Sequence, residues 1–207
     1  MLMPTKARAV VTRSTLMVVA MLLGACSGEV TAPAAARSRP LEATSLFVPS
    51  ASAKALIGVA DGSYTFTFDP DENQSIALGP NRLDIPGDAV CDLIKSGYGA
   101  EYWDRPCVPE KLPVTLTVII KNAASSNPSM SFYPAMRFNP GKNVRLFMYA
   151  PNVSSTDAKN WLMYYCPDLG QCVNESLTDS DLVTYIDYSH NILFRRIKHF
   201  SGYTVAE

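Results

Sequence analysis

The chain has 207 residues, of which 47% are hydrophobic and 18% are charged, and its formal net charge is −1 at pH 7. No cluster of basic residues accompanies this near-neutral balance, which argues against a nucleic-acid-binding protein. The length is sufficient for one hydrophobic core once an N-terminal segment is set aside.

The N-terminal segment has the composition of a secretory leader. Residues 1–13 carry Lys6, Arg8 and Arg13 and no acidic residue, and twelve mostly apolar residues, STLMVVAMLLGA, follow. A membrane-spanning helix needs about 20 apolar residues, whereas a basic start with a shorter apolar stretch is typical of a signal peptide. We therefore predict a signal peptide over residues 1–25. Its removal would leave fifteen of the eighteen basic residues against nineteen acidic ones, a net charge of −4.

The leader ends in a sequence that indicates lipidation. LGAC at 23–26 resembles the lipobox of bacterial lipoproteins, in which a branched apolar residue and two small residues precede a cysteine. The resemblance implies that Cys26 becomes the first residue and carries the lipid anchor; the alternative is an ordinary signal peptide with a chance cysteine. Because Ser27 stands where aspartate is the familiar inner-membrane retention signal, we expect a cell-envelope location, with the outer membrane favoured over the inner one.

Residues 26–54 are predicted to be the lipid anchor followed by a linker. The segment is rich in Ala, Pro, Ser and Thr, and Pro33, Pro40 and Pro49 are spread along it. Proline resists helix formation and interrupts strand pairing. The alternative is that the apolar residues 46–48 form a first strand of the folded domain, which we otherwise place at residues 55–207.

Four cysteines lie beyond the linker and predict disulfide bonds. An even number of cysteines in an exported chain favours two bridges, for which three pairings are possible. Nearest-neighbour pairing, Cys91 with Cys107 and Cys166 with Cys172, is our prediction. A four-cysteine zinc site is the rival, but such sites show paired cysteines two to four residues apart, a spacing that this chain lacks.

Alternation of apolar and polar residues predicts strands in the folded domain. In PVTLTVIIK, for example, Val114, Leu116, Val118 and Ile120 share one face. Such period-two stretches, rich in β-branched and aromatic residues, are typical of β-strands. No helix of ten or more residues is expected, so the predicted fold class is an all-β, antiparallel, immunoglobulin-like sandwich of seven or eight strands. The six clearest stretches are 64–69, 113–121, 143–151, 161–166, 182–187 and 192–200.

Three segments together resemble ZU5-type domains. They are NRLDIPGDAV at 81–90, FYPAMRFNPGKNVRLFMYAP at 132–151 and HFSGYTV at 199–205, and the first departs from the pattern by placing Asp88 where glycine is usual. The segments 91–112 and 152–180 have no counterpart in the pattern. The resemblance implies a sandwich of about eight strands that serves mainly as a protein-interaction or scaffolding module.

The triplet His199-Phe200-Ser201 raises the prediction of self-cleavage. In some ZU5-containing proteins a His-Phe-Ser triplet is cut when the serine hydroxyl attacks the preceding carbonyl, which needs a nearby base and a strained peptide. The resemblance would make His199 the base and Ser201 the nucleophile. The alternative is an ordinary closing strand, in which Phe200 packs inward.

Aromatic residues suggest a second binding function. Tyr102, Trp103, Trp161 and Tyr164 are candidate stacking platforms for a carbohydrate, although strands also bury aromatic side chains. An outward pair of rings on one face would favour a carbohydrate or peptide groove.

The sequence as a whole predicts an envelope-anchored, non-enzymatic interaction module. Carbohydrate binding and self-cleavage are the alternatives. We expect the membrane, through the lipid, and an envelope protein or glycan as partners, and we expect no metal, cofactor or nucleic acid.

Overall fold

The computed structural model describes residues 39–40, 61–155, 160–167 and 171–207. Within these residues the chain forms eleven strands and four short helical turns. Their bounds are β1 Arg39–Pro40, β2 Gly62–Phe68, β3 Gln74–Leu78, β4 Asn81–Ile85, α1 Leu93–Ser96, η1 Ala100–Tyr102, β5 Val114–Lys121, β6 Ser129–Arg137, β7 Arg145–Tyr149, β8 Leu162–Tyr165, η2 Glu175–Leu177, η3 Ser180–Leu182, β9 Tyr185–Asp187, β10 Ile192–Arg196 and β11 His199–Ala206.

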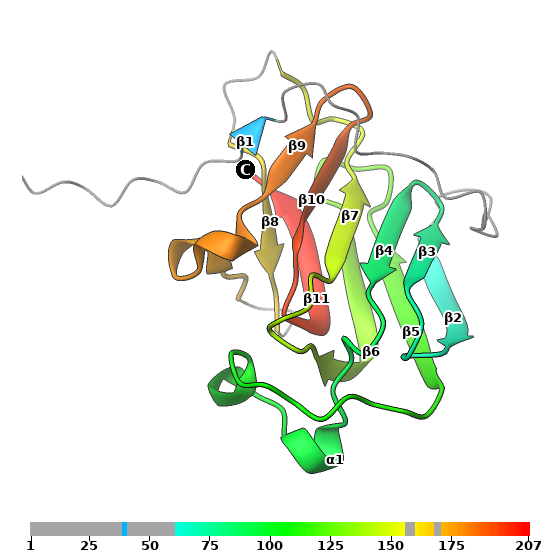
Figure 1. The fold of residues 1–207 in the computed structure, drawn as a ribbon. Helices are drawn as coiled ribbons and strands as arrows, with labels where there is room; N and C mark the ends of the chain where they lie inside the picture. Colours follow the sequence, from blue (N-terminus) through cyan, green and yellow to red (C-terminus); the bar gives the residue numbers. More distant parts are fainter. Residues whose placement is uncertain (1–38, 41–60, 156–159, 168–170) are drawn as a thin grey trace, which may run out of the picture. The chain divides into compact units, whose positions relative to one another are not determined.

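The strands form two sheets that pack face to face (Figure 1). One sheet has the order β1-β9-β10-β7-β4-β3 and the other β2-β5-β6-β11-β8. All pairings are antiparallel except that of β1 with β9, which is parallel. The predicted all-β sandwich is therefore confirmed. Two residues of the predicted linker, 39 and 40, form the short edge strand β1, a position where proline is tolerated.

The core lies between the sheets and follows the predicted alternation. In β5, Val114 and Leu116 are buried, while the intervening Thr115 is exposed. Leu146 and Leu193 of the six-stranded sheet join them in one cluster. Each apolar side chain of this size contributes roughly 1.5–3 kcal/mol when it is fully buried, which makes this cluster the main source of stability.

One predicted strand is wrong in extent. The stretch 192–200 was expected to be continuous, but β10 ends at Arg196 and β11 begins at His199 in the opposite sheet. At the crossing, the Ile197 N–H donates to the Val144 carbonyl at 3.0 Å, and the Lys198 carbonyl accepts from the Phe138 N–H at 2.8 Å. Backbone partners in the connection between β6 and β7 thus hold the corner. The apolar pattern of the stretch, which is not strictly alternating, does not indicate it.

The turn after β4 contains two positions at which the backbone restricts the residue type. Asp88 adopts a φ of 59°, in the left-handed region that favours glycine, and aspartate is among the residues that tolerate it. This is the position where the ZU5 pattern has glycine. At Gly87 a Cβ would lie 2.3 Å from the carbonyl oxygen of Asp71, so only glycine fits there.

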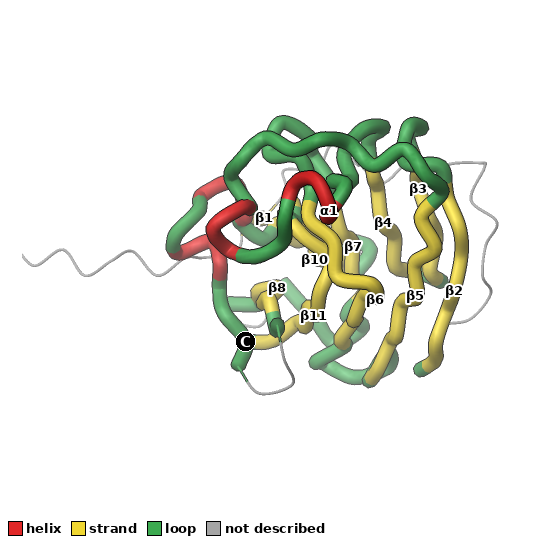
Figure 2. The backbone as a smooth tube through the Cα atoms, turned by 90° about the horizontal axis from the view of Figure 1, so that it is seen from below, coloured by secondary structure: helices red, strands yellow, loops and turns green. Residues whose placement is uncertain are grey.

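The short helical turns lie on the side of the sandwich away from β2 and β3 (Figure 2). Three of them, α1, η1 and η2, belong to the segments 91–112 and 152–180, the two parts of the domain for which the ZU5 pattern offers no counterpart. The remaining turn, η3, follows at Ser180–Leu182.

Candidate binding site

The first bridged segment, residues 91–112, is anchored beside the end of β6. Cys91 and Cys107 form a disulfide with a Cα–Cα distance of 5.6 Å, as predicted. Cys91 is fully buried, and its N–H donates to the Arg137 carbonyl at 3.0 Å. Asp92 then caps α1 by accepting hydrogen bonds from the two N–H groups of Ile94 and Lys95. Residues 92–106 therefore leave and return to the sandwich at one point.

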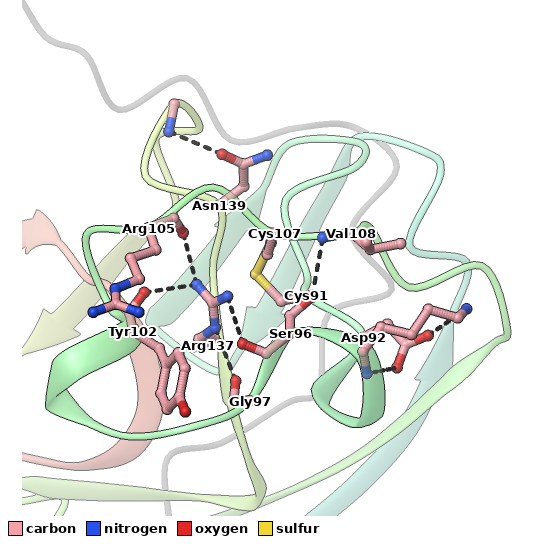
Figure 3. Close-up of a disulfide and its surroundings, with 12 residues drawn as sticks. Cys91, Asp92, Ser96, Gly97, Tyr102, Arg105, Cys107, Val108, Arg137 and Asn139 are labelled. Carbon is pink, nitrogen blue, oxygen red and sulfur yellow. Dashed lines mark hydrogen bonds and ion pairs between the residues drawn. A yellow bond between two sulfur atoms is a disulfide. The ribbon is translucent and has the colours of Figure 1, made fainter.

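Arg137 holds this segment in shape (Figure 3). Its guanidinium donates hydrogen bonds of 2.8–2.9 Å to the backbone carbonyls of Ser96, Gly97, Tyr102 and Arg105. The residue is 1% exposed, and burial lowers the pKa of its side chain. Two of the four carbonyls belong to the end of α1, where the unpaired carbonyls of a helix favour a cation.

The far end of this segment, residues 98–104, which we call its tip, contacts the start of β11. The indole of Trp103 stacks on the His199 ring with 4.0 Å between centroids. Asp104 forms an ion pair with Lys198, and the Tyr98 hydroxyl donates to the Phe200 carbonyl at 3.3 Å. The tip is thus fixed at three successive positions of the chain, 198, 199 and 200.

The second bridged segment, residues 166–179, follows β8 and also reaches the start of β11. Cys166 and Cys172 form the second predicted disulfide. Beyond it, Val173 and Tyr165 exchange two backbone hydrogen bonds of 2.6 and 3.0 Å. The Asn174 side chain accepts from the Ser176 N–H at 3.1 Å and so caps η2. These contacts place Glu175, which follows in this segment, near Trp103 and Asp104 at the tip of the first bridged segment. Residues 168–170, which lie between Cys166 and Cys172, are outside the described residues.

Glu175 belongs to a buried polar network. Its carboxylate forms an ion pair with Arg195 and lies 3.2 Å from Nε2 of His199. Because a carboxylate only accepts hydrogen bonds, Nε2 carries the proton. The Tyr203 hydroxyl donates to the His199 carbonyl at 2.8 Å, and Arg195 also donates to the Met163 carbonyl at 2.8 Å. Arg195 and His199 are fully buried, and Glu175 is 6% exposed.

Burial and charge set the ionisation of this network. Burial lowers the pKa of His199, and the neighbouring carboxylate raises it only in part, so the imidazole is neutral at pH 7. Burial raises the pKa of Glu175, but the His199 hydrogen bond and the Arg195 charge outweigh it and leave the pKa below its ordinary value. At neutral pH the Glu175 carboxylate is therefore stabilised by the hydrogen bond from His199 and by the charge of Arg195.

The two bridged segments enclose a pocket of about 530 Å³ above the network, which we call the loop pocket. Trp103 and Asp104 line it from the first segment, Glu175 and Asp179 from the second, and Lys198 from the crossing between the sheets. Burial lowers the pKa of Lys198, but the carboxylates of Asp104 and Asp179 outweigh this effect and raise it. The pocket is thus lined by fixed charges and one indole.

The same two segments carry most of the exposed large apolar side chains of the described chain. We call this set the apolar loop surface. Its members and their exposed fractions are Ile94 98%, Tyr98 37%, Val108 47% and Leu112 72% in the first segment, and Val173 50% and Leu177 64% in the second. Exposed apolar side chains on a folded domain are candidates for contact with another protein.

A second hollow lies on the outer face of the five-stranded sheet. This outer groove, of about 630 Å³, is lined by Lys121, Ser131, Tyr133, Ser201 and Thr204 and by the second disulfide. Tyr133 is 55% exposed. The backbone register places Thr204 opposite Tyr164, so the half-buried Tyr164 lies on the same outer face. Hydroxyl pairs Thr65–Thr117 and Thr67–Thr115, at 2.9 and 2.8 Å, continue this face across β2 and β5.

The structure places the candidate binding and cleavage residues of the sequence analysis in different environments. Trp161 is 2% exposed in the core, which removes it from the candidate stacking residues, whereas Tyr102 and Trp103 are half-buried at the first bridged segment. The ring nitrogens of His199 face Glu175 and Tyr203, while Ser201 lines the outer groove. Self-cleavage stays a prediction. Cys26 and the rest of the predicted leader lie outside the described residues.

Sequence reasoning missed Glu175, Arg195 and Lys198. The available signal was the pair of basic positions, 195 and 198, inside the otherwise apolar stretch ILFRRIKHF. Charged residues on the inner side of a strand are seldom buried without partners, and here Glu175 and Asp179 supply them. No comparable signal marked Glu175, which lies in a polar loop sequence.

Comparison of the chain with protein-family models, with curated proteins and with solved structures finds no match. Among the described residues, no helix has the length and apolar character needed to cross a membrane. The described part of the chain also contains no group of three or more His, Cys, Asp or Glu side chains placed to hold a metal ion.

Proposed function

We propose that the protein is a lipid-anchored envelope protein whose β-sandwich is a non-enzymatic protein-interaction module. The apolar loop surface carries this proposal. Six large apolar side chains are exposed on two segments that each contain a disulfide, and both segments line the loop pocket. A preorganised apolar surface loses little conformational entropy on binding, which favours association with another protein.

The charges of the loop pocket complement this surface. Asp104 and Asp179 hold Lys198 between them, and the Asp104 side chain is 76% exposed. Charged groups at the margin of an apolar patch select partners and orient them, while the apolar groups supply most of the affinity. The protein partner is therefore expected to bring an apolar centre with a basic margin.

The direct test is capture of partners from envelope extract by the full-length lipidated protein. Ile94→Ser and Leu177→Ser each remove an exposed apolar group without opening the core, and Tyr133→Ser is the matched control on the outer face. We expect a partner that the native protein and Tyr133→Ser retain and that the two loop variants lose. Recovery that is equal for all four proteins, or no partner at any salt concentration, contradicts the proposal.

Carbohydrate binding is a second candidate because of the outer groove. Tyr133 and Tyr164 lie on one outer face among serine and threonine hydroxyls, which suits a neutral sugar chain that needs a ring and many hydrogen-bond partners. Envelope polysaccharides should then retain the native protein and Trp103→Ala but not Tyr133→Ala. Failure of every polysaccharide to retain the native protein rejects this candidate and leaves the protein-interaction proposal standing.

A further inference from the structure

A third hollow of the described chain lies on the six-stranded sheet. It has a volume of about 740 Å³, and we call it the arginine groove. Lys142 lines it from the connection between β6 and β7, Arg145 from β7, Arg196 from β10 and Asp181 from η3. Arg195 also lines the groove, but its guanidinium is paired with Glu175, so three basic side chains remain for the single carboxylate of Asp181.

The strand register forces two of these cations together. Arg145 and Arg196 are direct partners in the antiparallel pairing of β7 with β10, so their side chains leave the sheet on the same face. Like charges directly opposite each other destabilise a strand pair. The fold nevertheless keeps this arrangement over a hollow that is open to solvent.

Two carboxylates lie near the arginine pair, and neither forms an ion pair with Arg145. Asp181 lies 3.2 Å from Arg196, which also donates to the Pro140 carbonyl. Asp84 is opposite Arg145 in the backbone register, but its carboxylate lies 3.1 Å from Arg82 and accepts from the Ser75 hydroxyl. Within the described part of the chain, no hydrogen bond or ion pair engages the Arg145 guanidinium.

We propose that the arginine groove binds a phosphate group. The groove is lined by four basic residues and one acidic residue. Because the Arg195 charge is compensated by Glu175, the other three basic residues and Asp181 leave a charge of +2, which a phosphate dianion neutralises. Guanidinium groups bind phosphate oxygens through paired hydrogen bonds, and an anion between Arg145 and Arg196 removes their repulsion. The hydroxyls of Ser180 and Tyr185, which also line the groove, can donate to the remaining oxygens.

This site is independent of the proposed protein-interaction function. The phosphate can be free or part of a lipid headgroup, and both sources present the same oxygens to the groove. The full-length protein in detergent is titrated at about pH 8, where the phosphate is a dianion, with inorganic phosphate, with pyrophosphate and with short-chain phosphatidic acid, and binding is followed by phosphorus NMR. Acetate serves as the singly charged control ligand.

The variants separate a specific site from general attraction to positive charge. Arg145→Gln and Lys142→Gln each remove one charge from the groove, and Lys121→Gln removes one charge from the other sheet. We expect saturable binding that weakens about tenfold or more in Arg145→Gln, because two charge-assisted hydrogen bonds are lost, and less strongly in Lys142→Gln. Lys121→Gln should bind as the native protein does.

Binding of phosphatidic acid but not of inorganic phosphate would assign the groove to lipid headgroups, and equal binding would assign it to phosphate from either source. No saturable binding of any phosphate compound overturns the proposal. It is also overturned if Lys121→Gln weakens binding as much as both groove variants do, since attraction would then follow net charge alone.

Discussion

Replacement of Arg137 by methionine is expected to release the first bridged segment and to destabilise the domain. The side chain is 1% exposed and its guanidinium donates to four backbone carbonyls of that segment. Methionine fills a similar volume but offers no donor, so the four carbonyls lose their partner. The Cys91–Cys107 bridge stays, because the cysteines are held by other contacts.

The size of the effect follows from these contacts. Hydrogen bonds to a charged group contribute about 1.5–3 kcal/mol each, so four would give about 6–12 kcal/mol if the arginine were not also dehydrated by burial. Breaking a buried charged group away from its partners costs about 3–5 kcal/mol in proteins. We therefore expect a loss of about 3–5 kcal/mol in the free energy of unfolding, a large part of the 5–15 kcal/mol typical of a domain.

Two tryptophans make the assay specific. Trp103 lies in the released segment and Trp161 lies in the core. In Arg137→Met, acrylamide should quench Trp103 in native buffer, whereas the Trp103→Phe background should show that Trp161 remains protected. Urea unfolding followed by fluorescence gives the free energy of unfolding. Arg105→Met is the matched control, since Arg105 is exposed and its side chain lies 5.5 Å over the Tyr102 ring.

Arg137→Lys distinguishes charge from geometry. Lysine keeps the charge but has one ammonium group with three donors, which cannot reach four separate carbonyls. Its stability should lie between those of the native protein and Arg137→Met. If Arg137→Met unfolds at the same urea concentration as Arg105→Met and Trp103 stays protected, the role assigned to Arg137 is refuted.

Three further predictions follow from the structure. Burial lowers the pKa of His199 below its ordinary value of 6.5, so the histidine takes up a proton in the unfolded chain before it does so in the folded one. The free energy of unfolding should therefore fall as the pH drops below 6.5, by up to about 1.4 kcal/mol per pH unit. In urea unfolding, His199→Gln should lack this dependence and His190→Gln should keep it. Gly87→Ala should lower the free energy of unfolding by about 1–3 kcal/mol, since the new Cβ would lie 2.3 Å from a backbone oxygen, and a melting temperature equal to that of the native protein would contradict this. The intact mass of the native protein should show residues 1–25 removed, a lipid on Cys26 and four oxidised cysteines; a species ending at Phe200 would establish self-cleavage and overturn the non-enzymatic proposal.

The sequence by itself determined the local features of the folded domain. Alternation along β5 identified the strand and its buried face, because the side chains of a strand point to opposite faces in turn. The disulfide pairing also followed from the sequence, since cysteines close along the chain meet at a small cost in loop entropy. Both properties depend on residues that are near one another in the chain.

Only the tertiary structure decided where the sites lie. Glu175 and His199 are 24 residues apart, and Trp103 and His199 are separated by 96 positions of the chain, and no local pattern connects them. The break between β10 and β11 likewise depends on backbone partners in the connection between β6 and β7, at Val144 and Phe138. Strand pairing between distant segments brings these groups together, and the chain reveals that pairing only when it is folded.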